Sequence, residues 1–184
     1  MIEENRNMTG EEENAEIKLA TIGDIADTKG KILAVDFGDV RTGIAISDER
    51  RSFAFGKCTV SVGGMRKTAE KVAKTAAESK VSAIIIGHPV NMNGTLGPRS
   101  EKAVTFALMV AKVLKYNSGH DVAYAGMGDL PVALFDERMT TMAASRYLNE
   151  TNTRGSKRKG VIDTLSAEII LQNALDRLKT IQHS

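Results

Sequence analysis

The sequence KILAVDFG, residues 31–38, decides how the fold is interpreted. Its apolar run Ile32–Val35 is typical of a fully buried strand, because it is short and continuous and a glycine soon follows it. The segment RTGIAIS, residues 41–47, is rich in small and branched residues, and the intervening Gly-Asp-Val can turn the chain back. The two segments therefore predict an antiparallel hairpin. Its first strand runs into an acid, Asp36, at the carboxyl edge where α/β proteins place functional groups.

Working outward from this hairpin, the chain alternates between apolar strands and segments with helical spacing of apolar residues. Further strands are expected at 53–61, 81–87 and 130–136, and helices at 65–79, 100–116, 142–150 and 161–179. The connections at 88–99, 117–130 and 152–160 are interpreted as loops. This order predicts three antiparallel strands followed by parallel strands with right-handed helical crossovers. We expect an α/β protein with a mixed five-stranded sheet flanked by helices, which is the layout of the ribonuclease H-like fold.

Charge is divided unevenly along the chain. Residues 1–30 contain eight acidic and three basic side chains, which gives them a net charge of −5. The whole chain has a net charge of +2, so residues 31–184 have a net charge of +7. We expect residues 1–30 to be an acidic, disordered extension and residues 31–184 to form one folded domain. A basic domain suits a polyanionic partner such as a nucleic acid.

Composition narrows the class of protein further. An apolar fraction of 42% is ordinary for a soluble globular protein, and no apolar run approaches the ~20 residues that a membrane helix needs. The acidic first residues do not resemble a secretory signal. The single cysteine, Cys58, cannot form an internal disulfide, and with only three histidines a zinc cage is not favoured. We therefore expect a cytoplasmic protein without a membrane partner.

Three acids far apart in the sequence each lie where a strand ends or a helix begins. Asp36 closes the first strand, Glu137 follows the strand that ends at Asp136, and Asp163 opens the last predicted helix. If these carboxylates converge, they repel each other and need a divalent cation such as Mg²⁺ or Mn²⁺. A pair of such ions can cleave a phosphodiester. Asp36, Glu137 and Asp163 are accordingly our candidate metal ligands and catalytic residues. Taken singly, each acid has a simpler explanation in a turn, a surface cluster or a helix dipole.

Basic and amide side chains near these acids are candidates for nucleic-acid contacts. A basic run precedes Asp163, and it is either a phosphate-binding loop or a solvated one. The loop between residues 91 and 97 offers amides, or is an ordinary glycine-rich connection. With aromatic residues at 4%, recognition should depend on backbone and shape rather than stacking. The candidates are Arg41, Asn91, Asn93, Arg138, Lys157, Arg158 and Lys159.

Four stretches together resemble the YqgF/RuvX family of Holliday-junction-resolvase-like proteins, which is assigned to maturation of the 16S ribosomal RNA precursor. They are VDFG with RTGIA at 35–45, GHPVNMNGT at 87–95, DERMTT at 136–141 and KGVIDTLSA at 159–167. Their order and spacing match across roughly residues 31–178. The chain departs from the family in its acidic arm, in a longer connection at 117–130, and in His88, whose position is often apolar in the family.

The resemblance implies a metal-dependent nuclease of the ribonuclease H-like superfamily. It selects Glu137 rather than Asp136 for the metal, and it leaves Arg138 to touch phosphate or to hold a carboxylate. It implies structured RNA as substrate, in the form of the ribosomal precursor or ribosomal particles. We expect a monomer or a homodimer, since the sequence does not distinguish the two. The alternatives are a resolvase of branched DNA and a non-catalytic RNA-binding module. An actin- or hexokinase-like phosphotransferase is disfavoured because that machinery needs two such lobes.

Overall fold

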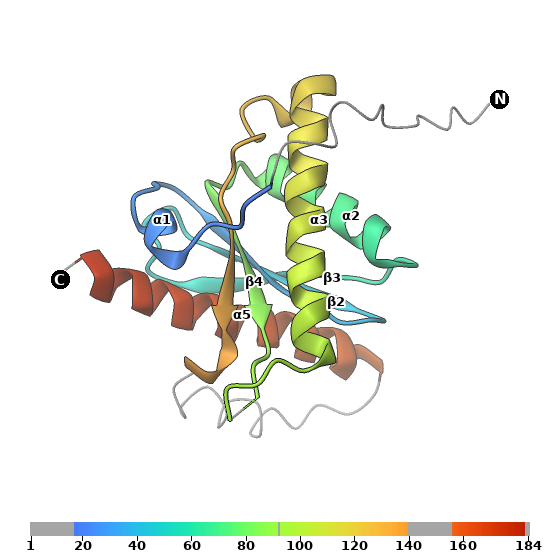
Figure 1. Cartoon of the computed structure of the whole chain (residues 1–184), viewed down its shortest axis with the longest axis vertical. Helices are drawn as coiled ribbons and strands as arrows, with labels where there is room; N and C mark the ends of the chain where they lie inside the picture. The colour runs from blue at the N-terminus through green and yellow to red at the C-terminus, as the bar shows by residue number, and fades with distance from the viewer. Residues whose placement is uncertain (1–16, 92, 140–155, 183–184) are drawn as a thin grey trace.

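A five-stranded sheet in the order β3-β2-β1-β4-β5 forms the centre of the computed structural model, which describes residues 17–91, 93–139 and 156–182 (Figure 1). The strands are β1 (Ile32–Asp36), β2 (Thr42–Ser47), β3 (Ala54–Val60), β4 (Ala83–His88) and β5 (Val132–Asp136). The strand β2 pairs antiparallel with β1 and β3, whereas β4 pairs parallel with β1 and β5. The mixed ribonuclease H-like sheet expected from the sequence is thus confirmed.

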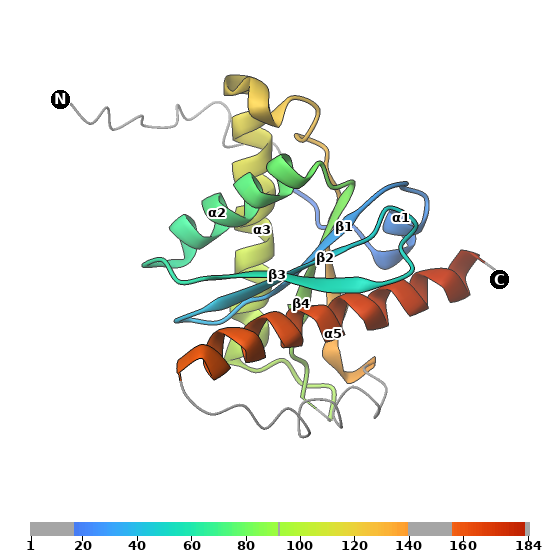
Figure 2. The same ribbon diagram turned by 180° about the vertical axis from the view of Figure 1, so that it is seen from behind.

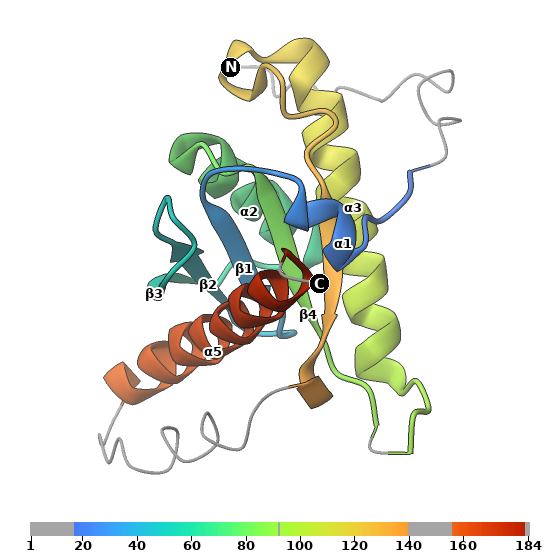
Figure 3. The same cartoon turned by 90° about the vertical axis from the view of Figure 1, so that its left-hand side faces the viewer.

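Helices cover both faces of this sheet (Figures 2 and 3). They are α1 (Ile22–Ala26), α2 (Met65–Ser79), α3 (Pro98–His120) and α5 (Ser156–Gln182), with 3₁₀ turns η2 (Val122–Tyr124) and η3 (Glu137–Met139). Buried residues of α2 and α3 form one core with one face of the sheet, and those of α1 and α5 form a second core with the other face. None of these helices combines the length and hydropathy that crossing a bilayer requires, as far as the chain is described.

Alternation along β1 divides its side chains between the two cores. Leu33 and Val35 are buried on the α2–α3 face, whereas Ile32 and Ala34 are buried on the α5 face. Because successive side chains of a strand point to opposite faces, the next position on the α5 face is Asp36. The strand thus delivers one acid to the edge of the sheet, beneath α5.

The folded domain begins earlier than the expected boundary at residue 31. Ala20 forms a parallel bridge with Ala133 of β5, and Ile25 of α1 is completely buried in the second core. The guanidinium of Arg51 donates to the carbonyl oxygens of Gly30 and Ile25 at 2.7 and 3.1 Å. Residues 17–30 hold as many basic as acidic side chains, and apolar burial together with these hydrogen bonds attaches them to the domain. The expected disorder of residues 1–16 lies outside the described residues.

Two helix boundaries also differ from expectation. The helix α3 continues to His120, and the stacking of Tyr116 on His120, with ring centroids 4.3 Å apart, supports its last turn despite the polar residues there. The helix α5 starts at Ser156, so the expected basic loop around Lys157 begins the helix instead. Asp163 consequently lies about two turns inside α5 rather than at its start. The expected helix at 142–150 lies outside the described residues.

Candidate active site

The site begins with the pairing of β1 and β2, which places Asp36 opposite Gly43. The helix α5 passes directly over this glycine. A Cβ atom built on Gly43 would lie only 1.8 Å from the carbonyl oxygen of Asp163. Only a residue without a side chain allows the helix to come so close, and this close approach brings Asp163 to the end of β1.

Glu137 reaches the same edge from β5. It is the first residue of η3, directly after the strand, and its carboxylate lies above Gly87 of β4. A Cβ atom on Gly87 would meet the Glu137 Oε1 atom and the Ile170 Cδ1 atom, both at 2.7 Å. The missing side chain of Gly87 therefore leaves the space that the Glu137 carboxylate occupies.

Asp36 lies within electrostatic reach of each of the other two acids. Burial raises the pKa of Asp36, and the charge of Asp163 raises it further. Burial likewise raises the pKa of Glu137 to about 6, with an added contribution from the charge of Asp36. Opposing these effects, the charge of Arg99 lowers both pKa values, and a hydrogen bond from Ser166 lowers that of Asp36. The acids named from the sequence are thus neighbours that repel one another.

Asp163 is held by an arginine. Its Oδ2 atom lies 2.8 Å from the Nε atom of Arg41, which forms an ion pair without the angles of a hydrogen bond. Both atoms are buried, and neither has a hydrogen-bond partner. A buried carboxylate oxygen without a hydrogen bond is costly unless a cation satisfies it. Here the cation in place is Arg41.

The donor set fits a hard divalent cation. Carboxylate oxygens suit Mg²⁺ or Mn²⁺, and the Asp163 Oδ2 atom has a lone pair that no hydrogen bond uses. As they stand, however, no three acidic, histidine or cysteine side chains of the described residues form a group that could hold an ion. Asp163 pairs with Arg41 through Oδ2, so this oxygen becomes free for an ion only if the pair opens.

Arg138 and Asp136 form a separate pair beside the site. The Arg138 Nε and Nη2 atoms donate to the Asp136 carboxylate over 2.6–3.1 Å, and Nη1 reaches the Asn91 carbonyl oxygen at 3.4 Å. Arg138 was expected either to contact phosphate or to hold a carboxylate. In the structure it holds the carboxylate of Asp136. The pair also links β5 to the loop after β4.

The loop residues predicted to contact nucleic acid mainly hold their own loop together. The Asn91 amide donates to the Thr95 hydroxyl at 2.9 Å, and the Asn93 side chain accepts from the Thr95 amide at 3.1 Å. Both asparagines are exposed. Lys157, Arg158 and Lys159 belong to the first turn of α5. Among the described side chains, no hydrogen bond joins Asn91 or Asn93 to the three acids.

Two residues near the acids were missed or misread in the sequence. Arg99 was placed at the end of a loop, whereas it is the second residue of α3. The signal was Pro98, since proline is common in the first turn of a helix and thus marks its start. Ser166 was not among the candidates, and it hydrogen bonds to Asp36.

His88, whose role the sequence left open, is part of the scaffold behind the site. Its Nε2 atom shares a hydrogen bond of 2.5 Å with the hydroxyl of Ser100, a fully buried residue of α3. Burial lowers the pKa of His88, against the opposing charge of Asp136. A neutral imidazole is therefore favoured, and it connects the end of β4 to the first turn of α3.

The sequence of this chain is similar to those of known proteins. The family model described as "RuvX: Holliday junction resolvase" matches residues 30–177. A protein of Ruminiclostridium cellulolyticum named "Putative pre-16S rRNA nuclease" is 37% identical over 149 residues, which cover 80% of this chain and 95% of that protein. A protein of the same name from Clostridioides difficile is 40% identical over 147 residues, with 80% and 94% covered.

Among solved structures, the chain is distantly similar to resolvases. The Thermus thermophilus RuvC structure matches with a TM-score of 0.48 and 12% identity, covering 82% of this chain and 97% of that one. RuvC of T. thermophilus in complex with a Holliday junction substrate matches with a TM-score of 0.46 and 9% identity, covering 84% and 96%.

Proposed function

The chain belongs to the RuvX family, and we propose that it is a metal-dependent endonuclease that hydrolyses phosphodiester bonds of the 16S ribosomal RNA precursor. The observation that carries this proposal is that Asp163 and Glu137 each lie within electrostatic reach of Asp36 at one edge of the sheet, where Gly43 lets α5 approach and Gly87 leaves room for Glu137. The name shared by the relatives supports the RNA substrate. The ion is Mg²⁺ or Mn²⁺, because all three side chains are hard oxygen donors.

In this proposal Asp36, Glu137 and Asp163 would hold the ions. Divalent ions bound there would activate the attacking water and stabilise the leaving oxygen. Ser166 orients Asp36 through its hydrogen bond. Glu137, with a pKa of about 6, is ionised at pH 7 and can serve as a ligand without first losing a proton. Arg41 releases Asp163 and becomes available to the phosphate backbone.

Substrate contacts away from the acids are assigned to the side chains singled out from the sequence. They recognise the sugar-phosphate backbone rather than base edges. They are Arg41, Asn91, Asn93, Arg138, Lys157, Arg158 and Lys159. The protein acts in the cytoplasm, as a monomer or a homodimer.

The test is cleavage of a 16S precursor RNA by the full chain with Mg²⁺, with Mn²⁺ and with a chelator. Asp36→Asn should reduce the rate by about 100-fold or more, since it removes a charge from the centre of the acid group. The matched control is Asp176→Asn, which makes the same change at an exposed position of α5. An Asp36→Asn protein that cuts at the normal rate refutes the assignment, as does cleavage that survives the chelator.

A second candidate is cleavage of branched DNA, which the description of the matching family favours. The same assay with a four-way DNA junction in place of RNA separates the two substrates. Faster metal-dependent cutting of the junction than of the precursor RNA would assign the protein as a resolvase. Binding of RNA without any cleavage would assign it as a binding module.

A further inference from the structure

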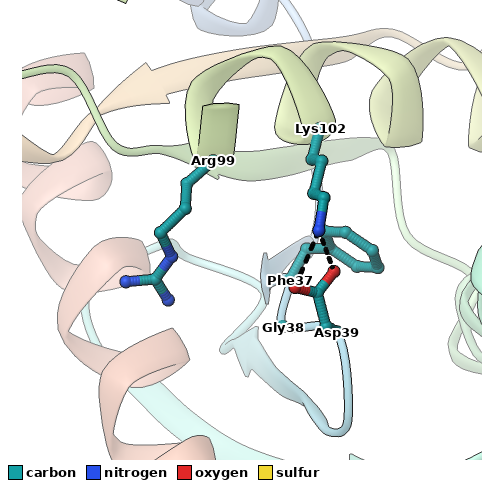
Figure 4. A pocket seen from close by; sticks show the side chains of 5 residues that line it. All are labelled: Phe37, Gly38, Asp39, Arg99 and Lys102. Atoms are coloured by element: carbon teal, nitrogen blue, oxygen red, sulfur yellow. Dashed lines mark hydrogen bonds and ion pairs between the residues drawn. The ribbon is translucent and has the colours of Figure 1, made fainter. Parts of the chain in front are cut away.

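Arg99 lines a small hollow at the turn that follows β1. The hollow lies between the start of α3 and the turn after β1, and Phe37, Gly38, Asp39, Arg99 and Lys102 surround it (Figure 4). Phe37 and Gly38 immediately follow Asp36 in the chain. The hollow therefore lies at the end of β1, where the chain leaves Asp36, and Arg99 is one of its two cationic side chains.

The guanidinium of Arg99 has donors that no other side chain claims. Figure 4 shows it turned away from the neighbouring Lys102, whose Nζ atom lies 2.8 Å from both carboxylate oxygens of Asp39. Arg41 and Arg138 are likewise paired with acids. Arg99 is exposed and, within the described residues, has no hydrogen bond or ion pair. Its five N–H groups are directed to water or to a ligand.

Although unpaired, Arg99 lies close enough for its charge to act on two acids at once. It lowers the pKa of both Asp36 and Glu137, against the effect of their burial. Arg99 thus lies near two candidate metal ligands and is paired with neither of them. In the proposed reaction, the substrate phosphate must lie in this region. A planar guanidinium fork matches the oxygens of a phosphate better than an ammonium group does.

We propose that Arg99 is a catalytic residue that donates hydrogen bonds to the non-bridging oxygens of the scissile phosphodiester above Asp36 and Glu137. This inference rests on the proposed nuclease function. As the attacking water oxygen bonds to phosphorus, these non-bridging oxygens gain negative charge, and the electron pair leaves with the departing oxygen when its bond to phosphorus breaks. Fixed donors aimed at developing charge lower the barrier. Arg99 would therefore contribute both to substrate affinity and to the rate of cleavage.

The first test measures binding without chemistry. In the Asp36→Asn background, the affinity for a labelled RNA hairpin is measured against salt concentration. Adding Arg99→Ala should weaken binding and reduce the slope of log affinity against log salt by about one, as expected for one lost phosphate contact. The matched control is Lys102→Ala, whose charge Asp39 already neutralises. An Arg99→Ala protein with the affinity and slope of its parent overturns the proposal.

The second test separates the hydrogen-bonding geometry of the Arg99 guanidinium from its positive charge. Arg99→Lys in the otherwise native chain keeps the positive charge, so the fall in kcat should exceed the rise in KM. We expect kcat to fall by about 100-fold, the effect of removing a fixed donor from a transition state. Full activity of Arg99→Lys would show that Arg99 only neutralises the acids. If the native chain does not cleave at all, the nuclease function fails, while the binding test still decides whether Arg99 contacts phosphate.

Discussion

Glu137 is the acid whose surroundings change its proton affinity most clearly. Its pKa of about 6, against an ordinary value of 4.5, comes first from burial and then from the charge of Asp36. Between pH 4.5 and 6 the folded chain therefore binds more protons at this position than the unfolded chain does. Stability falls as pH rises through this window, because the folded state must hold a charge that its surroundings disfavour.

Glu137→Gln removes this charge and should stabilise the metal-free protein above pH 6. We expect a gain on the order of 1 kcal/mol at pH 7, reduced from the full value because the carboxylate is only partly buried. Chemical denaturation at pH 5 and pH 7.5 checks it, with the exposed Glu78→Gln as control. Equal gains at both pH values would contradict the assigned cause.

At the scale of elements, the position of α5 depends on its contact with β2. The helix carries Asp163 and Ser166 to the site, and it also borders the edge strand. The Gln172 and Glu168 side chains of α5 accept hydrogen bonds from the Ala54 and Gly56 amides of β3, at 3.1 and 3.0 Å. These bonds satisfy donors that an edge strand otherwise exposes. One helix therefore completes the sheet and supplies part of the active site.

Gly43→Ala should push α5 away from β2. The new Cβ atom would lie 1.8 Å from the backbone of Asp163, which cannot rotate aside as a side chain can. We expect a loss of stability of about 2 kcal/mol or more, as for other overpacked sites. Urea denaturation measures the loss. Gly63→Ala is the matched control, because no atom lies within 4 Å of its added Cβ. Comparable losses in both variants would contradict the proposed contact.

At the scale of the whole molecule, the acids make the metal-free protein less stable than it could be. An ion that binds only the folded state stabilises it in proportion to the logarithm of ion concentration over Kd. If Asp36, Glu137 and Asp163 hold that ion, its binding is coupled to the global unfolding of the chain. The coupling can be measured without any nucleic acid.

Mg²⁺ or Mn²⁺ should accordingly raise the Tm of the native chain. At 100 times Kd the gain is about 2.7 kcal/mol, which corresponds to roughly 5–10 °C for a chain of this size. Thermal unfolding with increasing ion concentration measures it, and Asp36→Asn should lose most of the shift while Asp176→Asn keeps it. A shift that survives in Asp36→Asn would place the ion elsewhere.

The sequence by itself determined the sheet and the identity of the three acids. Continuous apolar runs such as Ile32–Val35 define buried strands, and their order along the chain determines which strands are parallel. The same logic makes Asp36 and Glu137 candidates, because they come where strands end, whereas the preference for Glu137 over Asp136 came from the family resemblance. These are local signals, since each depends on residues within a few positions of one another.

Only the tertiary structure decided which side chains meet. The ion pair of Arg41 with Asp163, the hydrogen bond of Ser166 to Asp36 and the unpaired Arg99 join residues that lie on different elements. The burial of Ile25, which brings the segment before residue 31 into the domain, is likewise a packing effect. Such contacts depend on distances between elements, and a helix can approach a strand as α5 does only where the opposing residue is Gly43. The periodicity of apolar residues in a sequence does not specify the distances between elements.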